Sequence, residues 1–158
     1  MTATTPHATG HAGLGALASR YVQVDELPWQ PTRFPGIEIK VLMEDKETGL
    51  LTALTRFAPG AVLPLHEHVE LEQSWVLEGS LVDAEGEAKV GDYVWRPAGS
   101  RHDAHSPQGA LVLSFFLRPN RFLEQTIRSS VTNGTLPAAR STQSPSLKSR
   151  KCGTPRTP

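Results

Sequence analysis

The sequence has little of several features that would assign it to a broad class. It contains a single cysteine, Cys152, so it cannot form an internal disulfide. No stretch approaches the roughly 18 consecutive apolar residues of a membrane-spanning helix. The first 20 residues lack the basic start and the long apolar run of a secretory signal peptide. We therefore expect a cytoplasmic protein with no membrane partner.

A strong net charge is also absent. The 16 Lys and Arg residues balance the 16 Asp and Glu residues, so no overall field attracts the chain to nucleic acid. The charges are unevenly placed, because all acidic residues lie before position 129 and the segment after it carries only basic ones. A basic tail could bind polyanions, but its charges are scattered and no aromatic residue lies among them. We interpret the tail as solvated and expect no nucleic-acid partner.

Length and patterning divide the chain into three parts. Its 158 residues are enough for one domain with a core and too few for two. Residues 1–19 are rich in Ala, Thr, Gly and His without periodicity, and residues 129–158 are rich in Ser, Thr, Pro, Lys and Arg. Such compositions bury too little apolar surface to fold, so we predict that both ends are disordered. The predicted domain spans residues 20–128.

Short runs typical of β-strands alternate with Pro and Gly inside this domain. Residues 37–43 alternate between apolar and polar side chains, and residues 111–117 form a continuous apolar run that suits a strand buried on both faces. Further strands are expected at residues 21–24, 50–57, 74–83 and 88–95, and one or two helical turns at residues 121–128. Roughly eight strands without an earlier helix predict an all-β sandwich or barrel.

Residues that could carry chemistry lie between positions 60 and 102. His66 and His68 are two apart, which in a strand directs both imidazoles to one face with Cα atoms about 6.5 Å apart. Both rings could then bind one ion at about 2.0–2.1 Å. An even offset keeps Glu72 on the same face if the strand is regular, and Glu70 is the competing carboxylate. His102 is expected to reach the site from a separate strand.

Three imidazoles and a carboxylate are ligands suited to Fe(II), Mn(II), Ni(II), Co(II) or Zn(II). They fill four positions, so an ion that prefers six keeps two adjacent positions open. Two open positions allow a substrate to chelate, or a substrate and O₂ to bind side by side. The ligand set therefore indicates oxidative chemistry.

Nine fixed positions of this stretch resemble the two cupin motifs. They are Gly60-x5-His66-x-His68-x3-Glu72-x6-Gly79 and Gly91-x5-Pro97-x-Gly99-x2-His102. The terminal Asn of the second motif is replaced by Ser106. Over about residues 25–120 the chain is most similar to the ChrR-like cupins, which include the metal-binding domain of zinc anti-sigma factors and free-standing relatives. It is similar more distantly to the acetylacetone-cleaving dioxygenases, which use three histidines without the glutamate.

The resemblance implies a small single-domain jelly-roll barrel of the all-β class. It implies one divalent transition metal held by His66, His68, Glu72 and His102, with Fe(II) favoured and Zn(II), Mn(II) or Ni(II) as alternatives. The family pattern also selects Glu72 over Glu70. Catalytic residues beyond these ligands are not assigned.

Three functions are compatible with the resemblance. The first is an Fe(II)-dependent dioxygenase that acts on a small dicarbonyl or hydroxy-carbonyl compound. The second is a ChrR-like sensor or regulatory domain without catalysis, although the sequence lacks a helical N-terminal zinc domain for direct anti-sigma action. The third is a barrel that a metal only stabilises. We favour the enzyme with a small-molecule substrate.

Other candidate residues are weaker. His105 could act as a base behind the metal ligands, but we interpret it as an exposed histidine. Arg56 and Arg96 could orient an anionic substrate, although outward salt bridges are the commoner role for arginine. Counting by twos from Glu72 places Trp75 on the outer face, where it would pack between sheets or against a second subunit. We expect a homodimer.

Overall fold

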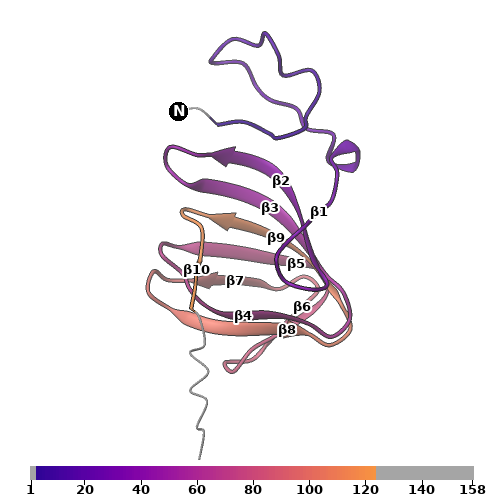
Figure 1. The fold of residues 1–158 in the computed structure, drawn as a ribbon, viewed down its shortest axis with the longest axis vertical. Helices are drawn as coiled ribbons and strands as arrows, with labels where there is room; N and C mark the ends of the chain where they lie inside the picture. Colours follow the sequence, from indigo (N-terminus) through magenta and orange to yellow (C-terminus); the bar gives the residue numbers. More distant parts are fainter. Residues whose placement is uncertain (1–2, 124–158) are drawn as a thin grey trace, which may run out of the picture. The chain divides into compact units, whose positions relative to one another are not determined.

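The computed structural model describes residues 3–123 of the chain. Those residues form ten strands and one short 3-10 helix, and all strand pairs are antiparallel (Figure 1). In chain order the elements are η1 (Val24–Glu26), β1 (Gln30–Pro31), β2 (Ile37–Asp45), β3 (Leu50–Phe57), β4 (Ala61–Glu67), β5 (Glu72–Val82), β6 (Glu87–Lys89), β7 (Tyr93–Arg96), β8 (Arg101–Ser106), β9 (Ala110–Phe116) and β10 (Arg121–Phe122). The all-β prediction is confirmed.

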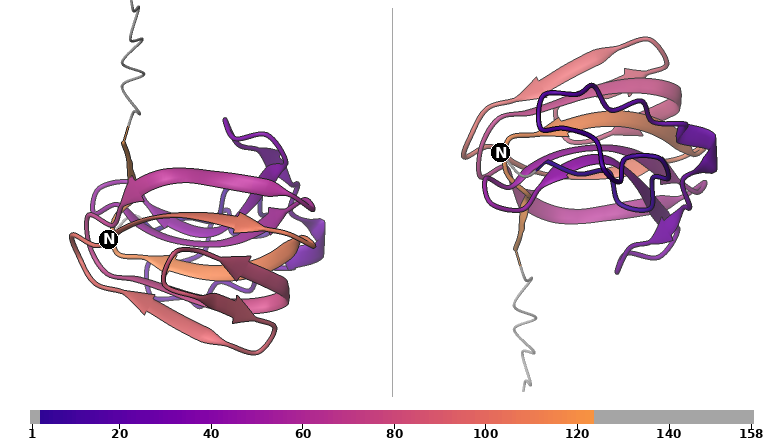
Figure 2. Two further views of the ribbon diagram at one scale, coloured as in Figure 1. Left: turned by 90° about the horizontal axis from the view of Figure 1, so that it is seen from below. Right: turned by 90° about the horizontal axis from the view of Figure 1, so that it is seen from above.

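The strands follow the order β1-β2-β3-β9-β5-β8-β4-β10, and β6 and β7 also pair with β5. The long strand β5 joins the two halves of the sheet. Its first residues pair with β7 and β9, and its last residues pair with β6 and β8. The sheet therefore curls on itself, as the end views in Figure 2 show, and gives the jelly-roll barrel that the sequence predicts.

The barrel interior is apolar at one end of β4 and polar at the other. Ala61, the first residue of β4, belongs to a buried apolar cluster. The other cluster members are Ile37, Phe57, Ala110 and Val112. His66, near the other end of β4, is also buried, with 1 % of its surface exposed. Because the apolar end supplies the packing, the polar end can hold ionisable side chains.

Gly79 allows β5 and β9 to approach closely. Its φ is +66°, and a Cβ atom added there would lie 1.9 Å from the carbonyl oxygen of Gly109. No side chain fits in that space, and L-residues rarely adopt that backbone conformation. The glycine that the first cupin motif requires at this position therefore has a structural reason.

Three local predictions differ from the structure. Residues 21–24 form no strand, and the 3-10 helix η1 follows instead. The single strand predicted at residues 88–95 divides into β6 and β7, because a turn at Gly91 (φ +92°) separates them. The helical turns predicted at residues 121–128 are replaced at their start by β10, which pairs with β4. Residues 124–128 lie outside the described residues.

The N-terminal segment contacts the sheet at a few points. Thr4 forms a bridge with Glu44 in β2, and the Thr5 hydroxyl donates to the carbonyl of Leu42 at 2.7 Å. Residues 129–158, predicted to be disordered, lie outside the described residues, and the predicted limits of the 20–128 domain stay predictions. No helix within residues 3–123 is long and apolar enough to cross a membrane.

Candidate metal centre

His66 and His102 lie opposite each other on neighbouring strands. The β4–β8 register pairs these two residues directly, and directly paired residues point to the same face of a sheet. Both side chains face the barrel interior, with ring centroids 4.6 Å apart. Strand pairing alone therefore brings together two histidines that are distant in the sequence.

His68 lies just beyond the end of β4 and is held by the loop before β8. Its backbone N–H donates to Ser100 at 3.0 Å, and its carbonyl accepts from the backbone N–H of Gly99 at 2.7 Å. These two bonds fix the direction of the wholly buried side chain. Its ring centroid lies 5.0 Å from that of His66 and 5.1 Å from that of His102.

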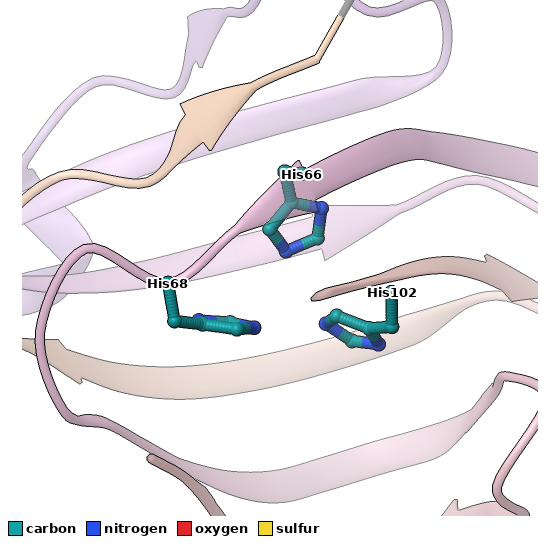
Figure 3. Close-up of side chains that lie close together, drawn as sticks. All are labelled: His66, His68 and His102. Atoms are coloured by element: carbon teal, nitrogen blue, oxygen red, sulfur yellow. The ribbon is translucent and has the colours of Figure 1, made fainter. Parts of the chain in front are cut away.

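The three histidines form one cluster, with one ring nitrogen of each facing the space between them (Figure 3). These potential ligand atoms all lie within 4.8 Å of one another. An ion with metal–nitrogen bonds of about 2.0–2.1 Å would fill that space after small side-chain movements. The sequence prediction that His66, His68 and His102 converge agrees with this arrangement.

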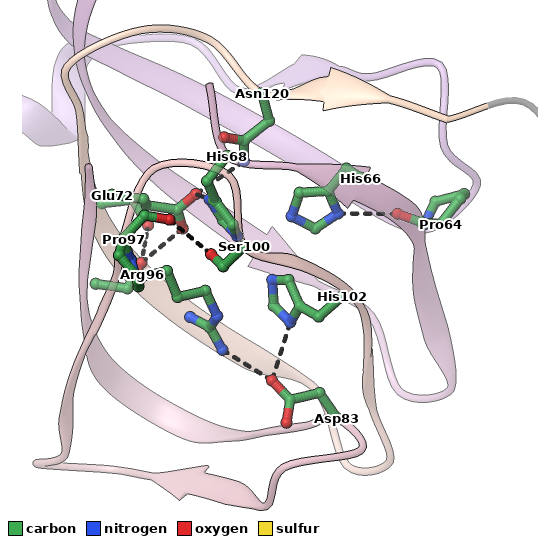
Figure 4. Close-up of polar contacts among 12 residues, drawn as sticks. Pro64, His66, His68, Glu72, Asp83, Arg96, Pro97, Ser100, His102 and Asn120 are labelled. Atoms are coloured by element: carbon green, nitrogen blue, oxygen red, sulfur yellow. Dashed lines mark hydrogen bonds and ion pairs between the residues drawn. The ribbon is translucent and has the colours of Figure 1, made fainter. Parts of the chain in front are cut away.

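The hydrogen bonds of the outer ring nitrogens decide which nitrogens are free. Nδ1 of His66 lies 2.9 Å from the carbonyl oxygen of Pro64, and Nδ1 of His102 lies 2.9 Å from Oδ2 of Asp83 (Figure 4). A carbonyl and an ionised carboxylate only accept, so each Nδ1 must carry the proton. The Nε2 lone pairs of both rings are then available to a cation.

Nε2 of His68 gives an independent test of whether a metal fits. It is buried and has no hydrogen-bond partner among the described residues. Buried polar atoms are rarely left without a partner, because the loss of hydration costs about 1–3 kcal/mol. Two further imidazoles that offer lone pairs cannot supply a donor, whereas a divalent cation satisfies all three rings. The donor set therefore fits a transition metal.

Glu72 begins β5 and lies behind His68 rather than within the three-histidine cluster. Its Oε2 is 2.9 Å from Nδ1 of His68, a close contact that is not aligned as a hydrogen bond. The carboxylate also accepts from Ser74 at 3.0 Å and from Asn120 at 2.8 Å. Glu70 is exposed. The assignment of Glu72 as fourth ligand stays a prediction, and its position on a new strand differs from the regular strand assumed from the sequence.

Burial and neighbouring charges keep the site ready for a cation. Burial and the nearby Arg96 charge lower the pKa of His102 to about 4. Burial also lowers the pKa of His66. Burial raises the pKa of Glu72, but the contacts from His68, Asn120 and Ser74 outweigh it and lower the value overall. At neutral pH His66 and His102 are therefore neutral and the Glu72 carboxylate is charged, as metal binding requires.

Aromatic side chains border the site beside β10. Phe122 pairs with His66 in the β10–β4 register, and their ring centroids are 5.3 Å apart. Phe34 packs on Phe122 at 4.4 Å. The Arg33 guanidinium lies over both phenylalanine rings, 4.9 and 4.7 Å from their centroids. One edge of the centre is therefore an apolar wall with a cation above it.

Sequence reasoning missed the polar residues that support the histidines. Asp83 and Asn120 lie outside both motifs, and Ser74 bonds to Ser114 at 2.8 Å across β5 and β9. Only the even spacing of Ser74 from Glu72 hinted at an inward side chain. Asp83 and Asn120 gave no signal, because their partners come from other strands.

The four other residues considered in the sequence lie in different environments. His105 is exposed, in agreement with the sequence interpretation. Arg56 forms an outward pair with Glu38 at 2.6 Å. Arg96 differs from the outward role expected of it, because its mostly buried guanidinium donates to Asp83 at 2.9 Å. Ser106 donates to the carbonyl of Ser80 at 2.7 Å and does not belong to the histidine cluster.

Comparison with known proteins agrees with this fold and site. A family model described as the ChrR Cupin-like domain matches residues 17–120. The chain belongs to the ChrR-like cupin family. No curated protein sequence matches this ChrR-like cupin significantly.

Solved structures place this ChrR-like cupin among several small barrels. A candidate acetylacetone dioxygenase from Methylibium petroleiphilum is 25% identical with a TM-score of 0.64, over 70% of this chain and 85% of that one. The acetylacetone dioxygenase of Acinetobacter johnsonii is 21% identical with a TM-score of 0.62, over 72% and 84%. Anti-sigma ChrR of Rhodobacter sphaeroides, in complex with SigE, is 20% identical with a TM-score of 0.52, over 60% and 51%.

Proposed function

We propose that this ChrR-like cupin is a mononuclear Fe(II)-dependent dioxygenase that acts on a small dicarbonyl or hydroxy-carbonyl compound. The observation that carries the proposal is the convergence of three imidazoles, including the partnerless Nε2 of His68, on one point inside the barrel. His66, His68 and His102 hold the ion, with Glu72 as the fourth ligand. The likeness to a candidate acetylacetone dioxygenase at 25% identity supports the reaction class.

Iron is favoured among the metals that imidazole accepts, with Zn(II), Mn(II) or Ni(II) as alternatives. When bound, Fe(II) would supply a Lewis acid for a chelating dicarbonyl and a redox centre for O₂. The protein's own residues bind the ion and orient the side chains that hold it. Pro64 and Asp83 hold the imidazoles of His66 and His102 from behind, and the Glu72 carboxylate lies 2.9 Å from Nδ1 of His68.

The wall beside β10 suits a small, flat, anionic substrate. Phe122 and Phe34 exclude water from the edge of the centre next to His66. Arg33 lies above them and forms no ion pair within residues 3–123, so its charge is available to an enolate oxygen. A planar enolate would therefore find an apolar surface, a cation and a metal close together.

The experiment is an anaerobic titration of the Fe(II) protein with acetylacetone, followed by admission of air. We expect a visible charge-transfer band on titration and then O₂ uptake in an oxygen electrode. The Zn(II) protein should bind the same compound without O₂ uptake, because zinc has no accessible redox change. The His68→Ala variant serves as the control without a complete site.

The alternative function is a ChrR-like sensor or regulatory domain without catalysis, which the family match over residues 17–120 favours. If the Fe(II) protein shows neither the band nor O₂ uptake across a broad panel of dicarbonyls, this alternative takes precedence. A zinc ion held tetrahedrally by all four residues, with no exchangeable ligand, would instead indicate a structural metal.

We further propose a homodimer formed through an aromatic face on the outside of the sheet. The face consists of Trp75, Tyr93, Trp95 and Phe115, which are 51%, 53%, 60% and 40% exposed. They lie on adjoining strands, since β5 pairs with both β7 and β9 at this point. A buried aromatic side chain covers about 150–250 Å², so four half-exposed rings offer roughly 300–500 Å². That is about half of the ~800 Å² per partner in a stable dimer.

A second copy of the chain is the occupant that this face suits. Gln73 lies between Trp95 and Phe115 in the register and already accepts from the Tyr93 hydroxyl at 2.8 Å, so the centre of the face carries no charge. The exposed Leu77, in β5, and Leu117, just after β9, add apolar area to this face.

We also propose a cytoplasmic location. A chain with one cysteine cannot form an internal disulfide, so an oxidising compartment would not stabilise its fold.

A further inference from the structure

Among the side chains around the metal centre, Asp83 accepts the most hydrogen bonds. It follows the last residue of β5, and its carboxylate is mostly buried. Oδ1 accepts from the backbone N–H groups of Glu85 and Gly86 at 2.9 and 3.1 Å. Oδ2 accepts from Arg96 at 2.9 Å and from Nδ1 of His102 at 2.9 Å. One oxygen therefore stabilises the turn, and the other faces the metal centre (Figure 4).

These contacts show that Asp83 is ionised. Oδ1 faces two backbone N–H donors and Oδ2 faces Arg96 and Nδ1 of His102, so no acceptor is left for a carboxyl proton. An ionised carboxylate can only accept hydrogen bonds. The facing nitrogen of His102 must therefore be Nδ1–H, and the lone pair lies on Nε2.

The other two histidines are supported differently. His66 is fixed by the backbone carbonyl of Pro64. A side-chain substitution at position 64 does not remove this carbonyl. His68 is fixed by its own backbone bonds to the loop before β8 and by Glu72. Only His102 depends on a side chain outside both cupin motifs for the choice of its tautomer.

We propose that Asp83 is a positioning residue that holds His102 in the Nδ1–H tautomer, and that Arg96 holds Asp83 in place. The inference rests on the proposed metal centre. A histidine in the opposite tautomer would point an N–H group at the cation and could not bind it. Asp83 therefore determines whether the β8 histidine is a ligand, without contacting the metal itself.

The Asp83→Asn variant tests this inference with little disturbance to the turn. The amide oxygen can still accept from the backbone N–H groups of Glu85 and Gly86. The amide NH₂ then takes the place of Oδ2, where it loses the hydrogen bond from Arg96 and donates toward His102. Nδ1 of His102 must become an acceptor, which moves the proton to Nε2, the nitrogen that faces the cluster.

The first measurement is the tautomer of His102 in the metal-free protein, read from the ¹⁵N chemical shifts of the ring nitrogens. We expect Nδ1–H in the wild type and Nε2–H in Asp83→Asn. The second is Zn(II) affinity by competition with a chromophoric chelator, which we expect to fall by about 10- to 100-fold in the variant. The Glu38→Gln variant removes a carboxylate from an exposed ion pair with Arg56 and should leave both measurements unchanged.

A second variant separates tautomer control from general electrostatics. Arg96→Gln removes a buried charge but leaves the carboxylate of Asp83 facing His102. We expect the Nδ1–H tautomer to persist in this variant, with a smaller loss of Zn(II) affinity than in Asp83→Asn. An equal or larger loss with the tautomer unchanged would assign the effect to charge and overturn the role given to Asp83.

Two further outcomes would overturn the inference. One is an Nε2–H tautomer of His102 in the wild type, which can be measured even if Asp83→Asn does not fold. The other is a folded Asp83→Asn protein with unchanged tautomer and Zn(II) affinity within about twofold of the wild type. Neither measurement involves O₂ or a substrate, so a failure of the dioxygenase proposal leaves this test intact.

Discussion

His66 and His102 face each other across β4 and β8, with ring centroids 4.6 Å apart. They lie 36 positions apart in the sequence. Their proximity depends on antiparallel pairing, which brings the end of β4 opposite the start of β8. The three-histidine cluster therefore forms only when the barrel closes, and we expect metal binding to report on folding.

Removing any one histidine of the cluster should abolish stoichiometric metal binding. His66→Ala or His68→Ala takes one of three converging lone pairs from a site whose geometry is already set, and we expect metal content to fall below one tenth of the wild type. The measurement is elemental analysis after dialysis against metal. His105→Ala, on the same strand as His102 but exposed, is the matched control and should retain full metal.

Glu72→Gln should weaken metal binding without abolishing it. The substitution removes the charge near His68 but leaves three imidazoles, and we expect about a 10- to 100-fold loss of affinity. Titration with Zn(II) against a chelator measures this. Glu70→Gln is the control, since Glu70 is exposed two residues earlier. A larger loss in Glu70→Gln than in Glu72→Gln would reverse the choice of carboxylate.

The stability of the metal-free protein should fall as the pH drops from about 6.5 to 4. Burial and the Arg96 charge lower the pKa of His102 to about 4 in the folded state, whereas an unfolded histidine titrates near 6.5. The unfolded state then binds more protons within this window, so acid favours unfolding. The contribution of His102 reaches at most about 3 kcal/mol.

Urea unfolding of the metal-free protein at several pH values measures this effect. His102→Asn should show a shallower pH dependence, while His105→Asn should match the wild type. Some dependence should remain in His102→Asn, because burial lowers the pKa of His66 in the same direction. A wild-type stability that is constant from pH 7 to 4.5 would contradict the buried, neutral state of His102.

Removing the two tryptophans of the aromatic face should convert a dimer into a monomer. Trp75→Ser combined with Trp95→Ser removes the largest apolar area of the face, and interface energy is concentrated in such aromatic side chains. Analytical ultracentrifugation of the wild type and the double variant measures the change. Val90→Ser is the control, because Val90 is 63% exposed between β6 and β7 without belonging to the face. A wild type that sediments as a monomer at all concentrations would disprove the dimer.

Gly79→Ala should destabilise the fold far more than Gly60→Ala. Both glycines have positive φ, but the added Cβ at Gly79 would lie 1.9 Å from the carbonyl oxygen of Gly109, whereas nothing lies within 4 Å at Gly60. We expect a loss of about 1 kcal/mol at Gly60 and more than about 3 kcal/mol at Gly79, where β5 and β9 must separate. Thermal unfolding distinguishes the two, and similar losses would show that β9 moves freely.

The sequence by itself determined the fold class, most strand positions and the inward face of β5. Strict alternation correctly separated the buried Ser74 and Val76 from the exposed Trp75, because successive strand residues point to opposite faces. Motif spacing also identified the three histidines that cluster. These features depend on local periodicity or on residues that the motif names.

The tertiary structure alone decided what surrounds those histidines. Asp83 reaches His102 from the end of β5, Asn120 reaches Glu72 from beyond β9, and Arg96 turns inward to Asp83. Local spacing could not show that Glu72 starts a new strand after a turn rather than continuing β4. Contacts between strands depend on register and sheet order, and these are set by the packing of the whole barrel.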